Sequence, residues 1–431
     1  MSSLYRSAIS ARIAKLPGLP PTNEDEDDEV PPLPTGMGPP PFAHTKPHTP
    51  KPPNPTYAPI SAQSFFAQAL SLHVPPRGLN YRAYYTPPRP SIREADGKDV
   101  DPIAEREADA GTVLVFHHGA GYGALSFACV AKEVHDLEPG LGVFAFDARG
   151  HGKTVPLGDS ADDSVHVTNR SSSSSSPPTT LLSSTNETNL STATLVDDLI
   201  ELLRTAFPEP KRAPTFILIG HSMGGSVIVR ACPHLQNAGY TLAGVVVLDV
   251  VEGSAIDALP HMHALLNTRP DGFDSIEEAV EWHVTTRLIH NPASARVSIP
   301  SVIVPSDSPL LRGGSQYPAT PTASRFPYTW RTPLRRTAPY WSDWFTNLSS
   351  LFLAARTARL LVLAGAERLD TPLMVGQMQG KFQVEVVRDV GHVLHEDDPQ
   401  ALAQIFVAFW RRNERARVGI GAGVRIRRVG E

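Results

Sequence analysis

The 431-residue sequence predicts an α/β fold in which helices flank a mostly parallel central sheet. Three observations support this prediction. Short, continuously apolar and partly β-branched runs recur along the chain, as expected for strands that are buried on both faces. Segments with helical spacing of apolar residues lie between them. A serine flanked by glycines joins one such run directly to a helix, at residues 220–224.

The sequence Gly-His-Ser-Met-Gly at 220–224 follows a predicted strand over 216–219, and a helix is predicted from Met223 to Leu235. In so sharp a turn the serine backbone is strained, and a side chain at either glycine would clash. Ser222 would then stand at the carboxyl edge of the sheet as a nucleophile. The N–H of Met223, at the helix N-terminus, would face a developing oxyanion. The alternative is a glycine-rich turn with a surface serine.

Upstream, residues 64–72 predict a short helix and residues 79–85 an edge strand, with buried strands over 112–116 and 143–146. A glycine-rich loop follows the strand predicted over 112–116. Such a loop can supply a second backbone N–H to an oxyanion, and we expect Ala120 to provide it.

Two features near this loop predict bracing rather than chemistry. His118 is expected to hold the loop in place and not to act as a base or metal ligand. The motif Asp-Ala-Arg-Gly-His-Gly at 147–152 is frequent in α/β-hydrolases, where its charged groups support a turn.

Several segments lack the composition of a packed core. Residues 1–60 are proline-rich with an acidic run, and 156–191 include six consecutive serines, so we expect a disordered N-terminal region and a flexible insertion. Residues 300–327 predict a weakly ordered part of a cap that spans 252–357. A basic tail, 413–431, follows the domain that begins at residue 61.

The second half resumes the alternation. Residues 194–207 predict a helix, 242–251 a strand, 273–298 a helix, 360–364 and 382–387 strands, and 399–412 the last helix. Aromatic residues gather in the predicted cap, which lies between core strands and would cover the active-site edge. The candidates for a substrate-binding groove are Trp330, Tyr340, Trp341 and Trp344; packing of the cap on the sheet is the alternative.

A serine nucleophile needs an imidazole to take its proton and a carboxylate to orient that imidazole. His392 follows a glycine between the last strand and the last helix, and we favour it over His395. Two carboxylates satisfy the chain order Ser, Asp, His. Spacing alone leans towards Asp370, because the loop after the penultimate strand is the commoner position, and leaves Asp249 open.

The motifs resemble those of the protein phosphatase methylesterases over most of 60–412. The matching blocks are LIGHSMGGS around Ser222, LDVVEGSAIDALP at 248–260, SARVSI at 294–299, YTWR with YWSDWFTNLSSLFL, GQMQGKF before residue 383, and GHVLHED at 391–397. GHSMG alone is shared by many hydrolases, whereas DVVEG-x-A-x-DAL and GQMQGKF are typical of this family.

The resemblance implies an α/β-hydrolase fold and a carboxylesterase that removes the methyl ester from the C-terminal leucine of the type 2A protein phosphatase catalytic subunit. It implies Ser222 as nucleophile, Asp249 as the acid in place of Asp370, and His392 as the base. It also implies that no metal or organic cofactor is needed. The long N-terminal region and the Ser-rich insertion depart from compact relatives.

Two other functions stay open. One is a general esterase or lipase for small molecules on the same fold, and the other is a phosphatase-binding inhibitor or stabiliser with secondary catalysis. Net charge is −5, so no global attraction to nucleic acid or to an anionic membrane is expected. The two cysteines form no metal-ligand spacing, and with no secretory segment at the N-terminus we expect a cytoplasmic or nuclear protein.

Overall fold

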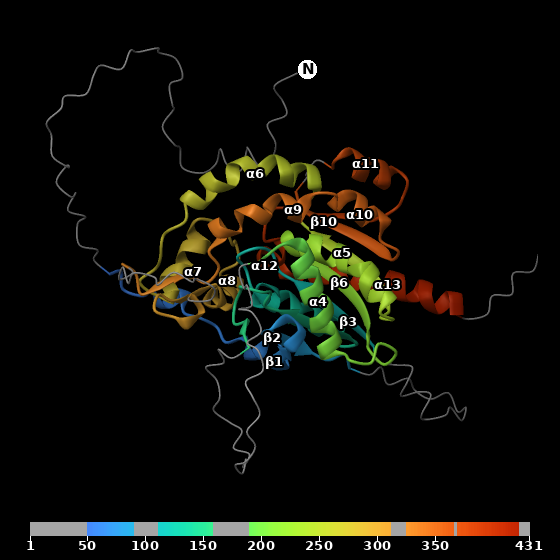
Figure 1. Cartoon of the computed structure of the whole chain (residues 1–431), viewed down its shortest axis with the longest axis horizontal. Helices are drawn as coiled ribbons and strands as arrows, with labels where there is room; N and C mark the ends of the chain where they lie inside the picture. The colour runs from blue at the N-terminus through green and yellow to red at the C-terminus, as the bar shows by residue number, and fades with distance from the viewer. Residues whose placement is uncertain (1–49, 90–110, 158–188, 312–324, 366–368, 422–431) are drawn as a thin grey trace, which may run out of the picture. The chain divides into compact units, whose positions relative to one another are not determined.

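A computed structural model of the chain describes residues 50–89, 111–157, 189–311, 325–365 and 369–421 (Figure 1). The predictions for 1–49 and for the serine run lie outside these ranges. Disorder was predicted as far as residue 60, and this is wrong for 54–60. There η1 (Pro55–Tyr57) forms, and the Arg296 side chain donates to the Ala58 carbonyl at 2.7 Å.

The centre of the fold is a sheet with strand order β1-β2-β4-β3-β6-β7-β10-β11, and β5 (Val155–Pro156) also pairs with β2. Pairing is antiparallel between β1 and β2 and between β2 and β4, and parallel from β4 to β11. The strands are β1 (Gln68–Val74), β2 (Leu79–Thr86), β3 (Thr112–His117), β4 (Leu141–Phe146), β6 (Thr215–His221), β7 (Leu242–Leu248), β10 (Ala358–Ala364) and β11 (Gln383–Val387).

The N-terminal hairpin corrects two predictions. Residues 64–72 are not a helix: after the 3-10 turn η2 (Ala62–Ser64), the chain enters β1. The run Leu70-Ser-Leu-His-Val74 alternates, with Leu70, Leu72 and Val74 on the covered side, which is the period of a strand. β2 is a strand as predicted, but it is not at the edge, because β1 covers it.

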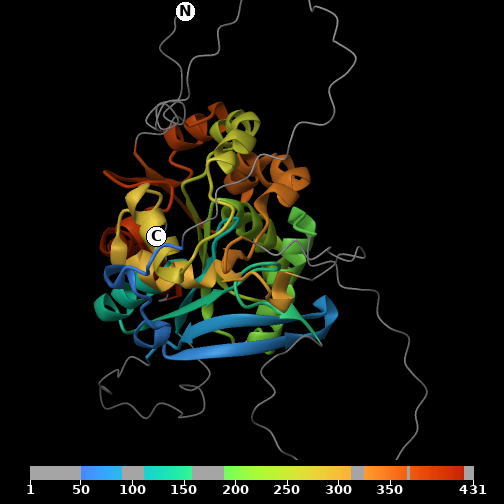
Figure 2. The same ribbon diagram turned by 90° about the vertical axis from the view of Figure 1, so that its left-hand side faces the viewer.

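Helices cover both faces of the sheet (Figure 2). One core cluster packs α4 (Thr192–Ala206) and α5 (Met223–Asn237) against the sheet. The other packs α3 (Ala128–Leu137) and α13 (Pro399–Gly421), with η4 (Ala124–Phe127). Helix α13 ends at Gly421, beyond the end predicted at residue 412. The described helices include none that is long and apolar enough to cross a membrane.

The cap occupies the interval between β7 and β10. It contains α6 (Glu252–Asn267), α7 (Ile276–Thr285), α8 (Pro292–Ser298), η5 (Ile299–Ser301), η6 (Pro309–Leu311), η7 (Leu334–Tyr340), α9 (Trp341–Phe345) and α10 (Leu348–Ala354). The helix predicted over 273–298 is two helices, because Asn291 caps a new helix that starts at Pro292. Weak order was predicted for 300–327. This is wrong for 303–305, where β8 (Ile303–Pro305) pairs with β9 (Tyr328–Trp330).

Candidate active site

The serine turn has the geometry of a nucleophile elbow. Ser222 lies between the end of β6 and the start of α5, with φ 52° and ψ −119°, a left-handed conformation that is unfavourable for a residue with a side chain. A Cβ at Gly220 would lie 2.3 Å from the Gly224 carbonyl oxygen, and one at Gly224 would lie 2.3 Å from that of His117. Both neighbours of the turn must therefore be glycine.

Asp249 and His392 are in direct contact beside this elbow. The Nδ1–H of His392 donates to Oδ2 of Asp249 at 2.9 Å, and the other oxygen, Oδ1, accepts the N–H of Ala364 at 2.7 Å. Asp249 follows β7 at φ 50° and is buried, whereas about half of the His392 side chain is exposed. This arrangement fixes one imidazole tautomer and leaves Nε2 as the free basic nitrogen.

The described hydrogen bonds include none to the Ser222 hydroxyl. The two parts of the site are nonetheless adjacent, because the ring of His221, the residue before the serine, lies 4.6 Å from the ring of His392. In free enzymes such catalytic hydrogen bonds are often long and tighten with substrate.

The two competing residues have structural roles. His395 is buried and stacks on Phe127 with ring centroids 4.4 Å apart; burial lowers its pKa to about 3. Asp370 caps α11 (Thr371–Met378), where it accepts the N–H of Leu373 at 3.1 Å and the hydroxyl of Ser349 at 2.5 Å. The spacing argument that favoured Asp370 is therefore outweighed by the contact that Asp249 makes.

The glycine-rich loop after β3 lies against the elbow. A Cβ at Gly119 would be 3.3 Å from that of Ser222, so the backbone approaches the serine closely. The next residue, Ala120, makes no hydrogen bond through its N–H among those of the described ranges. The N–H of Gly121 is occupied, because it donates to Nε2 of His151 at 2.9 Å. Ala120 thus presents a backbone donor beside the elbow, as does Met223 in the first turn of α5.

The buried residues behind the loop brace it. His118 accepts the N–H of Ala148 at Nε2 and donates from Nδ1 to the Gly119 carbonyl, at 2.9 and 2.8 Å. Asp147 accepts the N–H groups of Ala124 and Lys153. Burial lowers the pKa of His151 to about 4, so its ring stays neutral and accepts the N–H of Gly121 in the glycine-rich loop.

One positioning residue was not singled out from sequence. His221 is buried, and its Nε2–H donates to the main-chain carbonyl of His392 at 2.8 Å. Burial is the main cause that lowers the pKa of His221 well below its ordinary value, and the neighbouring His395 and His392 add to it. The neutral ring therefore ties the elbow to the loop that carries His392. Its place before the serine was the only signal in the sequence.

Comparisons with known proteins identify the fold and the family. An alpha/beta hydrolase family model matches residues 114–405. A protein phosphatase methylesterase 1 from Cryptococcus neoformans var. neoformans is 43% identical, over 97% of this chain and 94% of that protein. Proteins of the same name from Neurospora crassa and Aspergillus fumigatus are 39% and 35% identical, covering 80% and 96% of this chain and 70% and 90% of those proteins.

The chain belongs to the protein phosphatase methylesterase family. It is a carboxylic ester hydrolase of the α/β-hydrolase fold. The solved structure of E-2-(acetamidomethylene)succinate hydrolase is 16% identical with a TM-score of 0.52, over 80% of this chain and 99% of that chain, and this likeness concerns the fold alone.

In this methylesterase two of the four candidate cap aromatics are packing residues. Trp341 and Trp344 are 6% and 3% exposed, and their indole N–H groups donate to Thr337 Oγ1 and to the Leu190 carbonyl. Their burial argues against a substrate contact for these two. Trp330 is half-buried under the Arg269 guanidinium, 3.5 Å from the ring centroid, and Tyr340 is also half-buried. For this second pair a substrate contact stays a prediction.

Within the ranges that the structure describes, no group of three or more His, Cys, Asp or Glu side chains could hold a metal ion. Both cysteines, Cys129 and Cys232, are free thiols.

Proposed function

We propose that this carboxylesterase removes the methyl ester from the C-terminal leucine of a type 2A protein phosphatase catalytic subunit. The nucleophile is Ser222, the base is His392 and the acid that orients it is Asp249. The observation that carries the proposal is the 2.9 Å contact between His392 and Asp249 beside the strained serine turn. The names of the relatives support a protein phosphatase as the substrate, and the resemblance to their family implies the type 2A catalytic subunit and its C-terminal leucine.

In the first half of the reaction, His392 Nε2 takes the Ser222 proton while Oγ attacks the ester carbonyl carbon. The N–H groups of Met223 and Ala120 stabilise the oxyanion. The tetrahedral intermediate then expels methanol, which receives the proton from His392, and leaves an acyl-enzyme.

In the second half, His392 removes a proton from water, and the resulting nucleophile attacks the acyl carbon. Collapse of this intermediate returns the proton to Ser222 and frees the leucine carboxylate. The N–H groups of Met223 and Ala120 stabilise the oxyanion in both halves of the reaction, and the mechanism needs no further electrophile.

The methyl group offers almost no surface for binding. Recognition must therefore come from the leucine side chain, the peptide before it and the folded phosphatase, and that binding energy is used at the ester. With a protein partner of this kind, we propose that the enzyme acts in the cytoplasm or the nucleus.

The decisive experiment compares wild type with Ser222→Ala on methylated phosphatase catalytic subunit. Mass spectrometry of the C-terminal peptide should show loss of the methyl group with wild type only. The alanine variant should be slower by about 10⁶-fold. Equal demethylation by both proteins would overturn the proposal.

The same fold permits the two other functions. A fluorophosphonate probe should label Ser222 in wild type; an intact protein that binds phosphatase but ignores the probe would favour an inhibitor or stabiliser. Hydrolysis of short-chain esters faster than demethylation of the phosphatase would favour a general esterase.

A further inference from the structure

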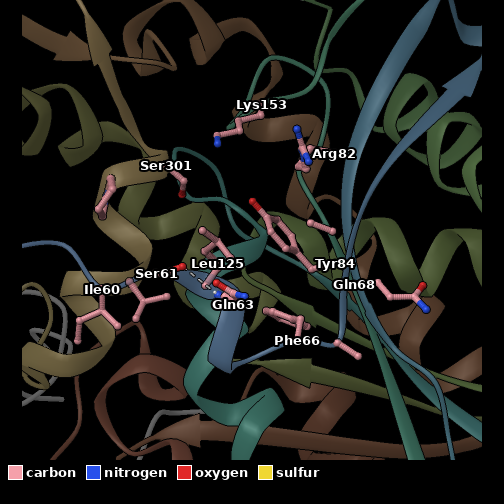
Figure 3. A pocket seen from close by; sticks show the side chains of 15 residues that line it. Ile60, Ser61, Gln63, Phe66, Gln68, Arg82, Tyr84, Leu125, Lys153 and Ser301 are labelled. Carbon is pink, nitrogen blue, oxygen red and sulfur yellow. Dashed lines mark hydrogen bonds between the residues drawn. The ribbon is translucent and has the colours of Figure 1, made fainter. Parts of the chain in front are cut away.

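A cavity of about 420 Å³ lies between the N-terminal hairpin and the cap (Figure 3). Its lining comes from residues 60–69, from β2, from η4, from the turn after β4, and from α8 with η5. Neither the elbow nor Asp249 nor His392 contributes to it. The cavity is therefore separate from the ester-hydrolysing site.

One part of the cavity is cationic. Arg82 and Lys153 both line it, and the Tyr84 hydroxyl points towards the space between them in Figure 3. The Nε of Arg82 is buried without a hydrogen-bond partner. Among the ion pairs of the described ranges, none involves Arg82 or Lys153. An unpaired buried guanidinium nitrogen is costly unless a ligand or water satisfies it.

The net charge of this part is one positive. Asp147 lies behind it and accepts the Lys153 main-chain N–H at 2.9 Å. Burial raises the pKa of Asp147, while Arg82 and Lys153 act in the opposite direction, so all three charges are within electrostatic reach of one another. One carboxylate offsets one of the two cations, and the surplus suits a monoanion better than a doubly charged phosphate.

Apolar side chains form another part of the lining, beside the polar residues Ser61, Gln63, Gln68 and Ser301. Ile60, Phe66, Leu125 and Val297 line the cavity, and Phe66 and Val297 are buried. A cavity of a few hundred cubic ångströms with an apolar wall and a few convergent polar groups is typical of small-molecule sites. The lining thus combines a cationic head with an apolar body.

We propose that this cavity binds a small amphipathic carboxylate, with the carboxylate between Arg82, Lys153 and the Tyr84 hydroxyl and its alkyl chain against Phe66, Leu125 and Val297. Arg82 and Lys153 donate charged N–H groups to the carboxylate, and Tyr84 adds a neutral donor. The site is distinct from the ester-hydrolysing centre and does not depend on it.

Calorimetric titration of the full chain with octanoate tests this assignment. Octanoate should bind, octylamine should not, and acetate should bind at least about tenfold more weakly than octanoate because it lacks the alkyl chain. Inorganic phosphate binding as tightly as octanoate would overturn the proposal, since it would indicate a site for oxyanions in general.

The matched variants locate the binding. Arg82→Met/Lys153→Met should weaken octanoate at least about tenfold, because charge-assisted hydrogen bonds are lost. Lys211→Met/Arg212→Met, which makes the same charge change elsewhere on the surface, should leave it unaltered. Unaltered affinity in the first variant would overturn the proposal.

Arg82 lies in β2, so the double variant is accompanied by one that leaves this strand unchanged. Lys153 is exposed, so Lys153→Glu alone tests the same head group without disturbing β2. It should also weaken octanoate, and ester hydrolysis should remain at the wild-type rate. An unchanged octanoate affinity in Lys153→Glu would count against the site as firmly as the same result in the double variant.

Discussion

At the scale of single residues, the site depends on two hydrogen bonds that orient His392. Asp249 accepts the N–H of one ring nitrogen of His392, and His221 donates to the main-chain carbonyl of the same residue. The first contact selects the tautomer and the second selects the position of the loop. A base aligned in this way loses little freedom when it takes the serine proton.

We predict that His221→Phe lowers kcat of ester hydrolysis about tenfold, with KM changed much less. The phenyl ring fills the same space but cannot donate to the His392 carbonyl, and one such hydrogen bond is worth about 1 kcal/mol. The measurement is steady-state hydrolysis of a chromogenic ester.

His234→Phe is the control, since His234 is exposed near the end of α5, the helix that follows the serine turn, and should keep wild-type kinetics. Thermal unfolding of both variants checks that the fold is intact. A His221→Phe enzyme with unchanged kcat would show that the contact to His392 has no positioning role.

At the scale of elements, local pattern predicted most of the sheet and only part of the cap. The apolar runs that became β3, β6, β7 and β10 were recognisable, because strands buried on both faces need continuous apolar sequence. The strand β1 was missed because Leu70, Leu72 and Val74 alternate over a short span and follow two phenylalanines that suggest a helix. Tertiary pairing with β2 decided its conformation.

The candidate site could likewise be predicted from local sequence only in part. Ser222 and His392 could be proposed from local sequence, since glycines within two residues of each indicate the sharp turn that its role needs. The choice of Asp249 over Asp370 could not be made from spacing, because it depends on which loop meets His392 in space. The burial of Trp341 and Trp344 depends likewise on how the cap packs against the sheet.

Asp249 contacts His392 whereas Asp370 caps α11, and this difference gives a prediction. Asp370→Ala should lower the free energy of unfolding by about 1–2 kcal/mol, because α11 loses its N-cap, while fluorophosphonate labelling of Ser222 continues. Asp249→Asn should leave the fold intact and lower the labelling rate by orders of magnitude, because the tautomer of His392 is no longer fixed. Chemical denaturation and labelling kinetics measure the two effects.

Asp343→Ala provides a comparison for the stability change, since among the hydrogen bonds of the described residues Asp343 accepts the Thr192 N–H alone, at the start of α4. Loss of labelling in Asp370→Ala with normal labelling in Asp249→Asn would reverse the assignment of the acid.

At the scale of the whole molecule, buried titratable groups set how stability varies with pH. Burial lowers the pKa of His117 and His151 to about 4 and that of His395 to about 3. The unfolded chain takes up these protons below about 6.5, so stability is lost as the pH falls towards 4. Glu396 acts in the opposite direction, because burial raises its pKa to about 8.

We therefore predict that Glu396→Gln stabilises the protein at pH 8 but not at pH 4.5. Glu396 is fully buried and accepts the Ser298 hydroxyl at 2.5 Å. Its native carboxyl keeps a proton that the unfolded chain releases above about 4.5, so the native state is progressively disfavoured as the pH rises from about 4.5 to about 8. Glutamine is neutral throughout, and the gain at pH 8 should reach a few kcal/mol. The exposed Glu209→Gln serves as control, and a stability difference between Glu396→Gln and wild type that is constant from pH 4.5 to 8 would contradict the prediction.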